Sequence, residues 1–209
     1  MDFRAFLLLL LILAPSQTAV RNLGPKLFNC DGEVNWIFLL DESGSMSGSN
    51  WSNLVSFMDS AVQRLIPPHN WVCVAKFNSY SSTSQIVAEK VNPDPNLNLG
   101  LYMSGGGTNF NAALSRANSF VNSYSNYNTC VVFVTDGHAS WSTSYADPLK
   151  TNLNTLENNG YDTCFLCYFI SSGGSVPSSF QTLCDYFNAD VIETDDEFDQ
   201  AADDFNNQI

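Results

Sequence analysis

Short, nearly continuous apolar runs alternate along this chain with stretches in which apolar residues recur every three or four positions. The apolar runs predict buried strands, and the recurring stretches predict amphipathic helices. Strands are expected at 34–40, 71–77, 130–134, 165–170 and 191–192, with a short edge strand at 85–88. Helices are expected at 54–65, 108–124, 147–156, 177–187 and 195–206.

This order of elements is typical of an α/β domain in which helices cover both faces of one sheet. We therefore predict a three-layer, doubly wound, mostly parallel sheet with one short antiparallel edge strand. The expected domain covers residues 34–209, after a lead-in at 20–33. A chain of 209 residues is long enough to bury one full core.

The first 19 residues have the pattern of a secretory signal peptide. An apolar run, Phe6 to Leu13, follows Arg4 and precedes small and polar residues, so cleavage is expected between Ser16 and Val20. The run is too short to span a bilayer, and no second long apolar run follows it. The sequence therefore predicts a secreted, extracellular protein with no membrane insertion.

The formal net charge of the chain is −13, and it stays there after cleavage because one acidic and one basic residue are lost together. Such an acidic chain repels nucleic acids and anionic lipid surfaces. A partner that meets a bound cation fits this charge better.

Six cysteines in an exported chain predict disulfides, although sequence alone leaves 15 pairings open. Cys164 and Cys167 have the spacing of a redox or zinc pair, but residues three apart in a strand point to opposite faces. The Asn50-Trp51-Ser52 sequon predicts a glycoprotein, and Asn50 could equally cap a helix.

Oxygen-bearing side chains follow or neighbour the predicted strands in three separate segments. Parallel strands present their carboxyl ends at one edge of a sheet, so these side chains are expected to converge there. Hard oxygen ligands without His or Cys favour Mg²⁺, or alternatively Mn²⁺ or Ca²⁺, over zinc or copper. Gly44 and the Gly105–Gly107 run give the loops freedom to approach the ion. The predicted metal ligands are Asp41, Ser43, Ser45, Thr108 and Asp136.

These residues, in this order, make residues 34–206 resemble the von Willebrand factor A domain family, with its metal-ion-dependent adhesion site. The apolar residues before Asp41 and the Val132–Gly137 segment add to the resemblance. The resemblance implies a Rossmann-like domain that binds an extracellular protein or matrix ligand. In that family, a Glu or Asp carboxylate of the ligand often completes the coordination of the metal.

Two other interpretations remain open from the sequence. The five residues could be ordinary helix caps and turn residues of a metal-free interaction module. A phosphatase with Asp41 as its nucleophile would need a second Asp two residues later, where Ser43 stands. A hydrolase using Ser45 would need a base from His69 or His138, and the Gly-x-Ser-x-Gly elbow is absent because Met46 stands at its centre. We therefore expect no enzyme activity.

Overall fold

The computed structural model describes residues 33–65, 70–79, 85–94, 97–171, 173–207 and 209. The predicted signal peptide, most of the lead-in, Cys30, His69 and the Pro67–Pro68 stop all lie outside these residues. Among the described residues, no helix combines the length and apolar character needed to span a lipid bilayer.

The described strands form one sheet in the order β3-β2-β1-β4-β5-β6. All neighbouring strands are parallel except β2 and β3, which are antiparallel. The predicted fold class is therefore confirmed. The strands are β1 (Val34–Asp41), β2 (Asn70–Phe77), β3 (Gln85–Val91), β4 (Asn128–Thr135), β5 (Thr163–Phe169) and β6 (Val191–Ile192).

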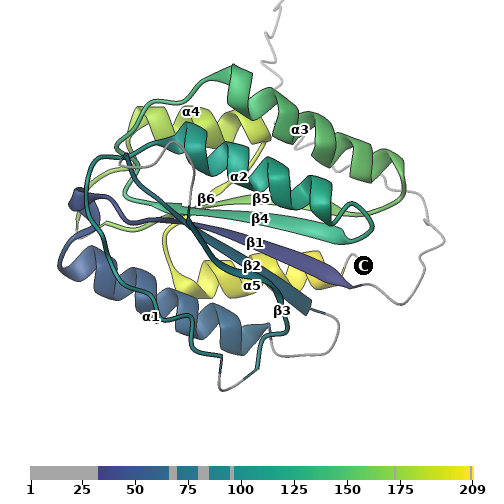
Figure 1. Cartoon of the computed structure of the whole chain (residues 1–209), viewed down its shortest axis with the longest axis horizontal. Coiled ribbons are helices and arrows are strands. Elements are labelled where there is room, and N and C mark those ends of the chain that lie inside the picture. Colours follow the sequence, from purple (N-terminus) through teal and green to yellow (C-terminus); the bar gives the residue numbers. More distant parts are fainter. Residues whose placement is uncertain (1–32, 66–69, 80–84, 95–96, 172, 208) are drawn as a thin grey trace, which may run out of the picture.

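Helices cover both faces of the sheet, which gives the three layers visible in Figure 1. One face carries α2 (Phe110–Ser123), α3 (Thr143–Asn158) and α4 (Ser178–Phe187). The other face carries α1 (Ser49–Arg64) and α5 (Asp195–Asn206). A 3₁₀ turn, η1 (Gly44–Met46), connects β1 to α1.

Each face of the sheet buries its own apolar cluster. Ile37 and Leu39 of β1 point into the cluster under α2, α3 and α4, whereas Phe38 and Leu40 point into the cluster under α1 and α5. Because successive side chains of a strand alternate between faces, a strand covered on both sides must be apolar at nearly every position. This is why the continuous apolar run predicted β1 correctly.

Several elements begin or end differently from the prediction; α1, for example, begins at Ser49 rather than at Leu54. Helix α3 starts four residues earlier than expected, with Ser142 as its N-cap, so Pro148 lies inside the helix rather than at its first turn. The expected start at Asp147 was wrong, because the Ser142 side chain caps the helix upstream by accepting the Ser144 N–H. Strand β3 runs to Val91, three residues beyond the expected end, and it contains a register shift opposite Val72 and Val74.

Strand β5 carries one disulfide on each face. Cys164 bonds to Cys130 of the neighbouring strand β4, and Cys167 bonds to Cys184 of α4. The two cysteines of the C-x-x-C spacing therefore point to opposite faces, as predicted, and do not form a redox or zinc pair. Cys73 is buried and has no disulfide partner among the described residues, which do not include Cys30.

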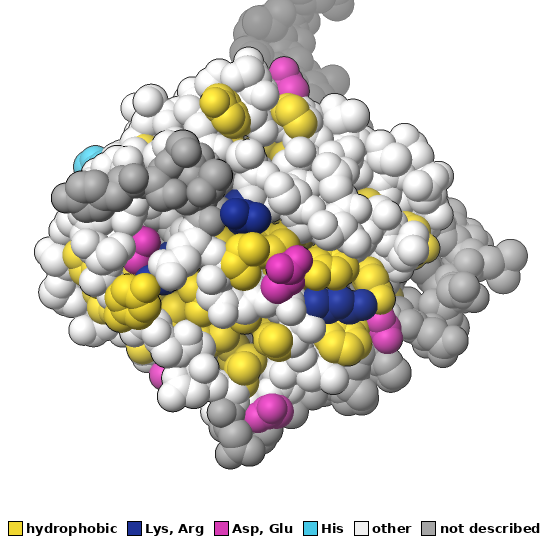
Figure 2. Space-filling view, viewed as in Figure 1, with side chains coloured by type: hydrophobic (Ala, Val, Ile, Leu, Met, Phe, Trp, Pro, Cys, Tyr) yellow, Lys and Arg dark blue, Asp and Glu magenta, His cyan; other side chains and the backbone are white. Residues whose placement is uncertain are grey.

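The irregular edge strand β3 is fixed to the body of the molecule by Lys90. This residue has a left-handed backbone (φ 49°), and its ammonium lies over the rings of Trp71, Tyr124 and Tyr127. Bulged residues and lysines at an edge discourage pairing with another chain. Hydrophobic side chains nevertheless gather on the face shown in Figure 2, and Ile86 in β3 is 39% exposed.

Candidate metal site at the carboxyl edge of the sheet

The candidate site lies where the order of strands reverses. From β1 the chain moves outward to β2 and β3, and then returns to place β4 on the other side of β1. At such a switch point, the connections after the two central strands diverge and leave a crevice. Asp41 is the last residue of β1, and Asp136 directly follows β4.

Asp41 is fully buried and is fixed by two hydrogen bonds. Its Oδ1 accepts the Ser43 N–H at 2.8 Å, and its Oδ2 accepts the Thr135 hydroxyl at 2.6 Å. Burial, with a smaller contribution from the Asp136 charge, raises the pKa of Asp41 to about 6 against the lowering effect of these hydrogen bonds. The carboxylate is therefore held in place, and burial disfavours its charged form unless a cation neutralises it.

Ser43 and Ser45 lie side by side in the η1 segment, with their hydroxyl oxygens 2.9 Å apart. Neither caps α1, because the N-cap of that helix is Gly48 and it makes no side-chain capping bond. Asn50 does not cap the helix either, since it lies inside the first turn of α1. These side chains therefore do not cap α1; Ser43 stands at the N-cap of η1 without a side-chain capping bond, and its hydroxyl bonds to that of Ser45.

The glycine segment before Thr108 packs directly against the Asp41 loop. The Gly44 N–H donates to the Gly106 carbonyl at 2.6 Å, and a Cβ on Gly44 would come within 3.1 Å of that oxygen. Gly107 is fixed in turn by Ser79, whose backbone N–H donates to the Gly107 carbonyl at 2.7 Å. The two glycine segments therefore lie in direct contact, and their expected approach to an ion stays a prediction.

Thr108 is half-buried and directly follows this segment. It does not open α2, as the sequence had suggested: the N-cap is Asn109, whose side chain accepts the Ala112 N–H. Because Asn109 performs the capping, the Thr108 hydroxyl is not needed by the helix. Its position therefore follows from the contact between Gly106 and Gly44.

Asp136 supplies the observation that most favours a cation. The residue is 5% exposed, and its Oδ1 is buried without a hydrogen-bond donor from the part of the chain that the structure describes. A buried carboxylate oxygen that is not hydrogen-bonded is costly unless a cation neutralises it. Two buried carboxylates and nearby hydroxyls are a donor set that suits Mg²⁺, Mn²⁺ or Ca²⁺.

Besides its two carboxylates, the site has few side chains that bind metals strongly. Among the described residues, no group of three or more His, Cys, Asp or Glu side chains could hold a metal ion. The candidate set contains two carboxylates and takes its other oxygens from hydroxyls. Such a set leaves coordination positions for water or for an external ligand.

Sequence reasoning missed the residues that support the site. Thr135 donates to Asp41, and its Oγ1 also accepts the Gly137 N–H at 2.9 Å. The only signal for Thr135 in the sequence was its position before Asp136. That signal is weak, because threonine commonly ends strands. Glu42 and Lys76 were also missed, and they form a buried ion pair at 2.9 Å beside the site.

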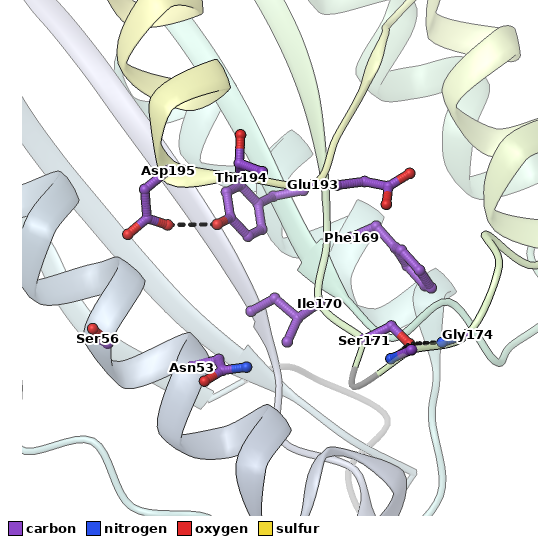
Figure 3. Close-up of a pocket in the computed structure, with 11 residues that line it drawn as sticks. Asn53, Ser56, Phe169, Ile170, Ser171, Gly174, Glu193, Thr194 and Asp195 are labelled. Carbon is purple, nitrogen blue, oxygen red and sulfur yellow. Dashed lines mark hydrogen bonds between the residues drawn. The ribbon is translucent and has the colours of Figure 1, made fainter.

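A second feature, a cavity of about 360 Å³, lies along the same edge between α1 and the segments after β5 and β6 (Figure 3). Asn53 and Ser56 of α1 line one side, and Asp195 at the start of α5 lines another. The Tyr168 hydroxyl donates to Asp195 Oδ1 at 2.5 Å. The polar groups here are largely exposed and bonded to one another.

Residues 36–138 match the sequence profile of the von Willebrand factor type A domain. This match includes β1, the glycine segment and Asp136. Together with the fold, it supports a von Willebrand factor type A domain in this chain. No curated protein sequence matches the chain.

Solved structures share the von Willebrand factor type A fold at low sequence identity. A von Willebrand factor type A protein from Catenulispora acidiphila aligns with a TM-score of 0.60 and 16% identity, over 85% of this chain and 42% of that one. The manganese-loaded TRAP protein of Plasmodium vivax aligns with a TM-score of 0.53 and 17% identity, over 78% of this chain and 69% of that one.

A third structure, an aerotolerance-related membrane protein from Bacteroides fragilis, aligns with a TM-score of 0.58 and 13% identity. The alignment covers 84% of this chain and all of that one, 100%. At these identities the likeness concerns the fold. The chain spans less than half of the Catenulispora protein, so the activity of that protein cannot be transferred to it.

Proposed function

We propose that this protein is a secreted, divalent-cation-dependent binding module that grips an acidic group of a partner protein or matrix component. The main support is the buried, unpartnered Oδ1 of Asp136 near the buried carboxylate of Asp41. Two carboxylates that repel each other in a buried site are stabilised when a cation binds between them. Von Willebrand factor type A domains often mediate protein interaction and adhesion, which agrees with this proposal.

In the proposed site, Ser43, Ser45 and Thr108 provide hydroxyl oxygens, while Asp41 and Asp136 provide carboxylates directly or through water. When bound, the ion offers an electrophilic position to a Glu or Asp carboxylate of the partner. Mg²⁺ is the proposed ion, with Mn²⁺ or Ca²⁺ as alternatives, because all three prefer oxygen ligands. The two aspartates balance the charge of a divalent ion.

Secretion and glycosylation at Asn50 belong to the same proposal. The two disulfides agree with an oxidising compartment, where such bonds persist. The Asn50 side-chain amide donates to the Ser45 carbonyl at 3.4 Å. A glycan at Asn50 would therefore stand beside the metal site and restrict the size of the partner.

We propose no enzymatic role. The Ser45 hydroxyl bonds to the Ser43 hydroxyl rather than to a base, and His138 is exposed after the Asp136 turn. Nucleophilic catalysis needs a nucleophile, a base and an orienting group within reach of one another. Labelling of Ser45 by a fluorophosphonate probe would contradict this part of the proposal.

Calorimetric titration with Mg²⁺ and Mn²⁺ tests the metal site. We expect one site in the wild-type protein and no measurable site in Asp136→Ala, because the replacement removes one of two carboxylates. Asp190→Ala is the matched control, since Asp190 is exposed and lies after α4. Equal affinity of all three proteins would mean that Asp136 is not a ligand, and no uptake by the wild type would favour a metal-free interaction module.

Capture from extracellular extract tests the adhesive function. Immobilised wild-type protein is incubated with extract in Mg²⁺ and again in EDTA, with Asp136→Ala in parallel. We expect partners that are retained by the wild type in Mg²⁺ and lost in the other two conditions. Partners retained equally in all three would contradict metal-dependent binding.

A further inference from the structure

Glu42 stands between two proposed ligands but faces away from them. Asp41 points toward β4, where it accepts the Thr135 hydroxyl, whereas Glu42 points toward β2. Its Oε1 accepts the Asn78 amide at 3.0 Å, and its Oε2 accepts the Lys76 ammonium at 2.9 Å. A third carboxylate is thus present at the edge of the site, and its charge is satisfied by other groups.

Lys76 is buried as deeply as its partner. The side chains of Lys76 and Glu42 are 1% and 4% exposed. The Lys76 ammonium also donates to the Tyr102 carbonyl at 2.8 Å and lies 3.6 Å from the centre of the Tyr102 ring. The Ser104 N–H donates to Glu42 Oε2 at 3.3 Å, so the pair also holds the segment that leads to Thr108.

A buried ion pair is not an efficient way to stabilise a fold. Removing both charges from water costs about as much as their attraction returns, and apolar pairs of similar volume often serve as well. An ion pair kept at this place therefore points to a role in the charge of the neighbouring site.

We propose that the Glu42–Lys76 pair determines how strongly the metal site accepts an acidic partner. This inference rests on the function proposed above. With Asp41 and Asp136, a divalent ion forms a site of zero formal charge. Lys76 neutralises Glu42, so Glu42 adds no net charge and an incoming carboxylate meets a metal site of zero formal charge. Without Lys76, the Glu42 charge would repel that carboxylate across a poorly solvated edge.

The test uses Mn²⁺ and acetate as probes. Mn²⁺ is added first, and acetate is then titrated against the Mn²⁺-loaded protein while water proton relaxation reports the displacement of water from the ion. The variants are Lys76→Met, Glu42→Gln and the double variant. Arg64→Met is the control, because Arg64 forms ion pairs with Asp199 and Asp203 at the other end of α1.

The expected shifts have opposite signs. Lys76→Met weakens acetate binding by about tenfold, and Glu42→Gln strengthens it by a similar factor, because each leaves one uncompensated charge. The double variant returns to within about threefold of the wild type, since it carries neither charge. Arg64→Met leaves the acetate affinity unchanged.

A purely structural role would loosen the site in both single variants and shift acetate binding in the same direction. That result, or no shift in either variant, would overturn the inference. If the wild type still takes up Mn²⁺, the proposed function stands even then. A wild-type protein that takes up no Mn²⁺ would overturn both. If circular dichroism shows that Lys76→Met is unfolded, Glu42→Gln and the double variant decide the outcome. Stronger acetate binding in Glu42→Gln that is reversed in the double variant supports the inference. Any other result for these two variants overturns it.

Discussion

Two acidic regions at the same edge of the sheet differ in how their carboxylates are satisfied. At the end of β1 and β4, Asp41 and Asp136 are buried, and one oxygen of Asp136 has no donor. At the start of α5, Asp195 and Glu197 are exposed and accept hydrogen bonds from within the chain. The comparison shows that a buried carboxylate oxygen without a hydrogen-bond donor indicates a ligand site, whereas a high density of acidic residues does not.

The pKa directions of the two regions reflect the same contrast. Burial raises the pKa of Asp41 to about 6. Hydrogen bonds, the largest from the Glu193 N–H, lower the pKa of Glu197. Glu197 and Thr194 form a capping box that satisfies the first turn of α5. Glu197 therefore serves its own helix, whereas Asp199 and Asp203 form ion pairs with Arg64 of α1.

The largest expected effect is on metal uptake. Asp41→Ala should lower Mn²⁺ affinity by more than about 100-fold, because changes to residues that only support a ligand already cost roughly 10–100-fold. Asp195→Ala should leave it unchanged. Calorimetric titration measures the Mn²⁺ affinity of both variants. Equal losses of affinity would contradict the prediction. An unfolding curve is needed for Asp41→Ala, since its buried hydrogen bonds are lost as well.

A smaller loss of affinity is expected at Thr108. Thr108→Ala should weaken Mn²⁺ binding by about tenfold, less than Asp41→Ala, because it removes a neutral oxygen rather than a charge. Thr108→Ser keeps the hydroxyl and is the matched control. A loss as large as that of Asp41→Ala would show that the ranking of the two ligands is wrong.

At the α5 region, alkaline pH should reduce stability. Burial and the bond to Asp195 raise the pKa of Tyr168 above its usual value of 10.0. The folded state therefore holds this proton more tightly than the unfolded state. Its contribution is complete below pH 10 and falls as the pH rises above that value.

Urea unfolding of the wild type and Tyr168→Phe from pH 8 to pH 11 measures this effect. The wild type should be more stable at pH 8 by about 1.5–3 kcal/mol, the range for hydrogen bonds to charged groups. The advantage should shrink above pH 10. A constant difference over the whole range would contradict the prediction.

The smallest expected effect concerns the helix cap. Thr194→Ala should lower the free energy of unfolding by about 1 kcal/mol, because the Glu197 N–H loses its acceptor. Mn²⁺ affinity should not change. A change in affinity without a change in stability would mean that this region contributes to the metal site after all.

The sequence predicted elements well where periodicity was strong. The α1 stripe is correct because Leu54, Phe57 and Met58 are all buried, and α5 has the expected bounds. Local signals were weaker: α3 was expected to start at Asp147, but the Ser142 cap places its start at Thr143. The extent of β3 was missed because its bulge disrupts alternation.

For the candidate site, the sequence indicated the three segments but not their supports. Asp41 and Asp136 follow strands whose parallel arrangement could be predicted, so their convergence was predictable too. The Thr135 bond and the Glu42–Lys76 pair depend on side-chain direction at strand ends. No periodic pattern records that direction, because each is a single contact between residues far apart in the chain.

The two disulfides of β5 have a mechanical consequence. They tie β5 to β4 on one side and to α4 on the other, so the strand that leads to Asp136 belongs to a covalently braced block. The glycine segment on the opposite side of the site is secured by hydrogen bonds alone in the part of the chain that the structure describes. If a captured partner were pulled, we expect the braced block to bear the load and the glycine segment to yield first.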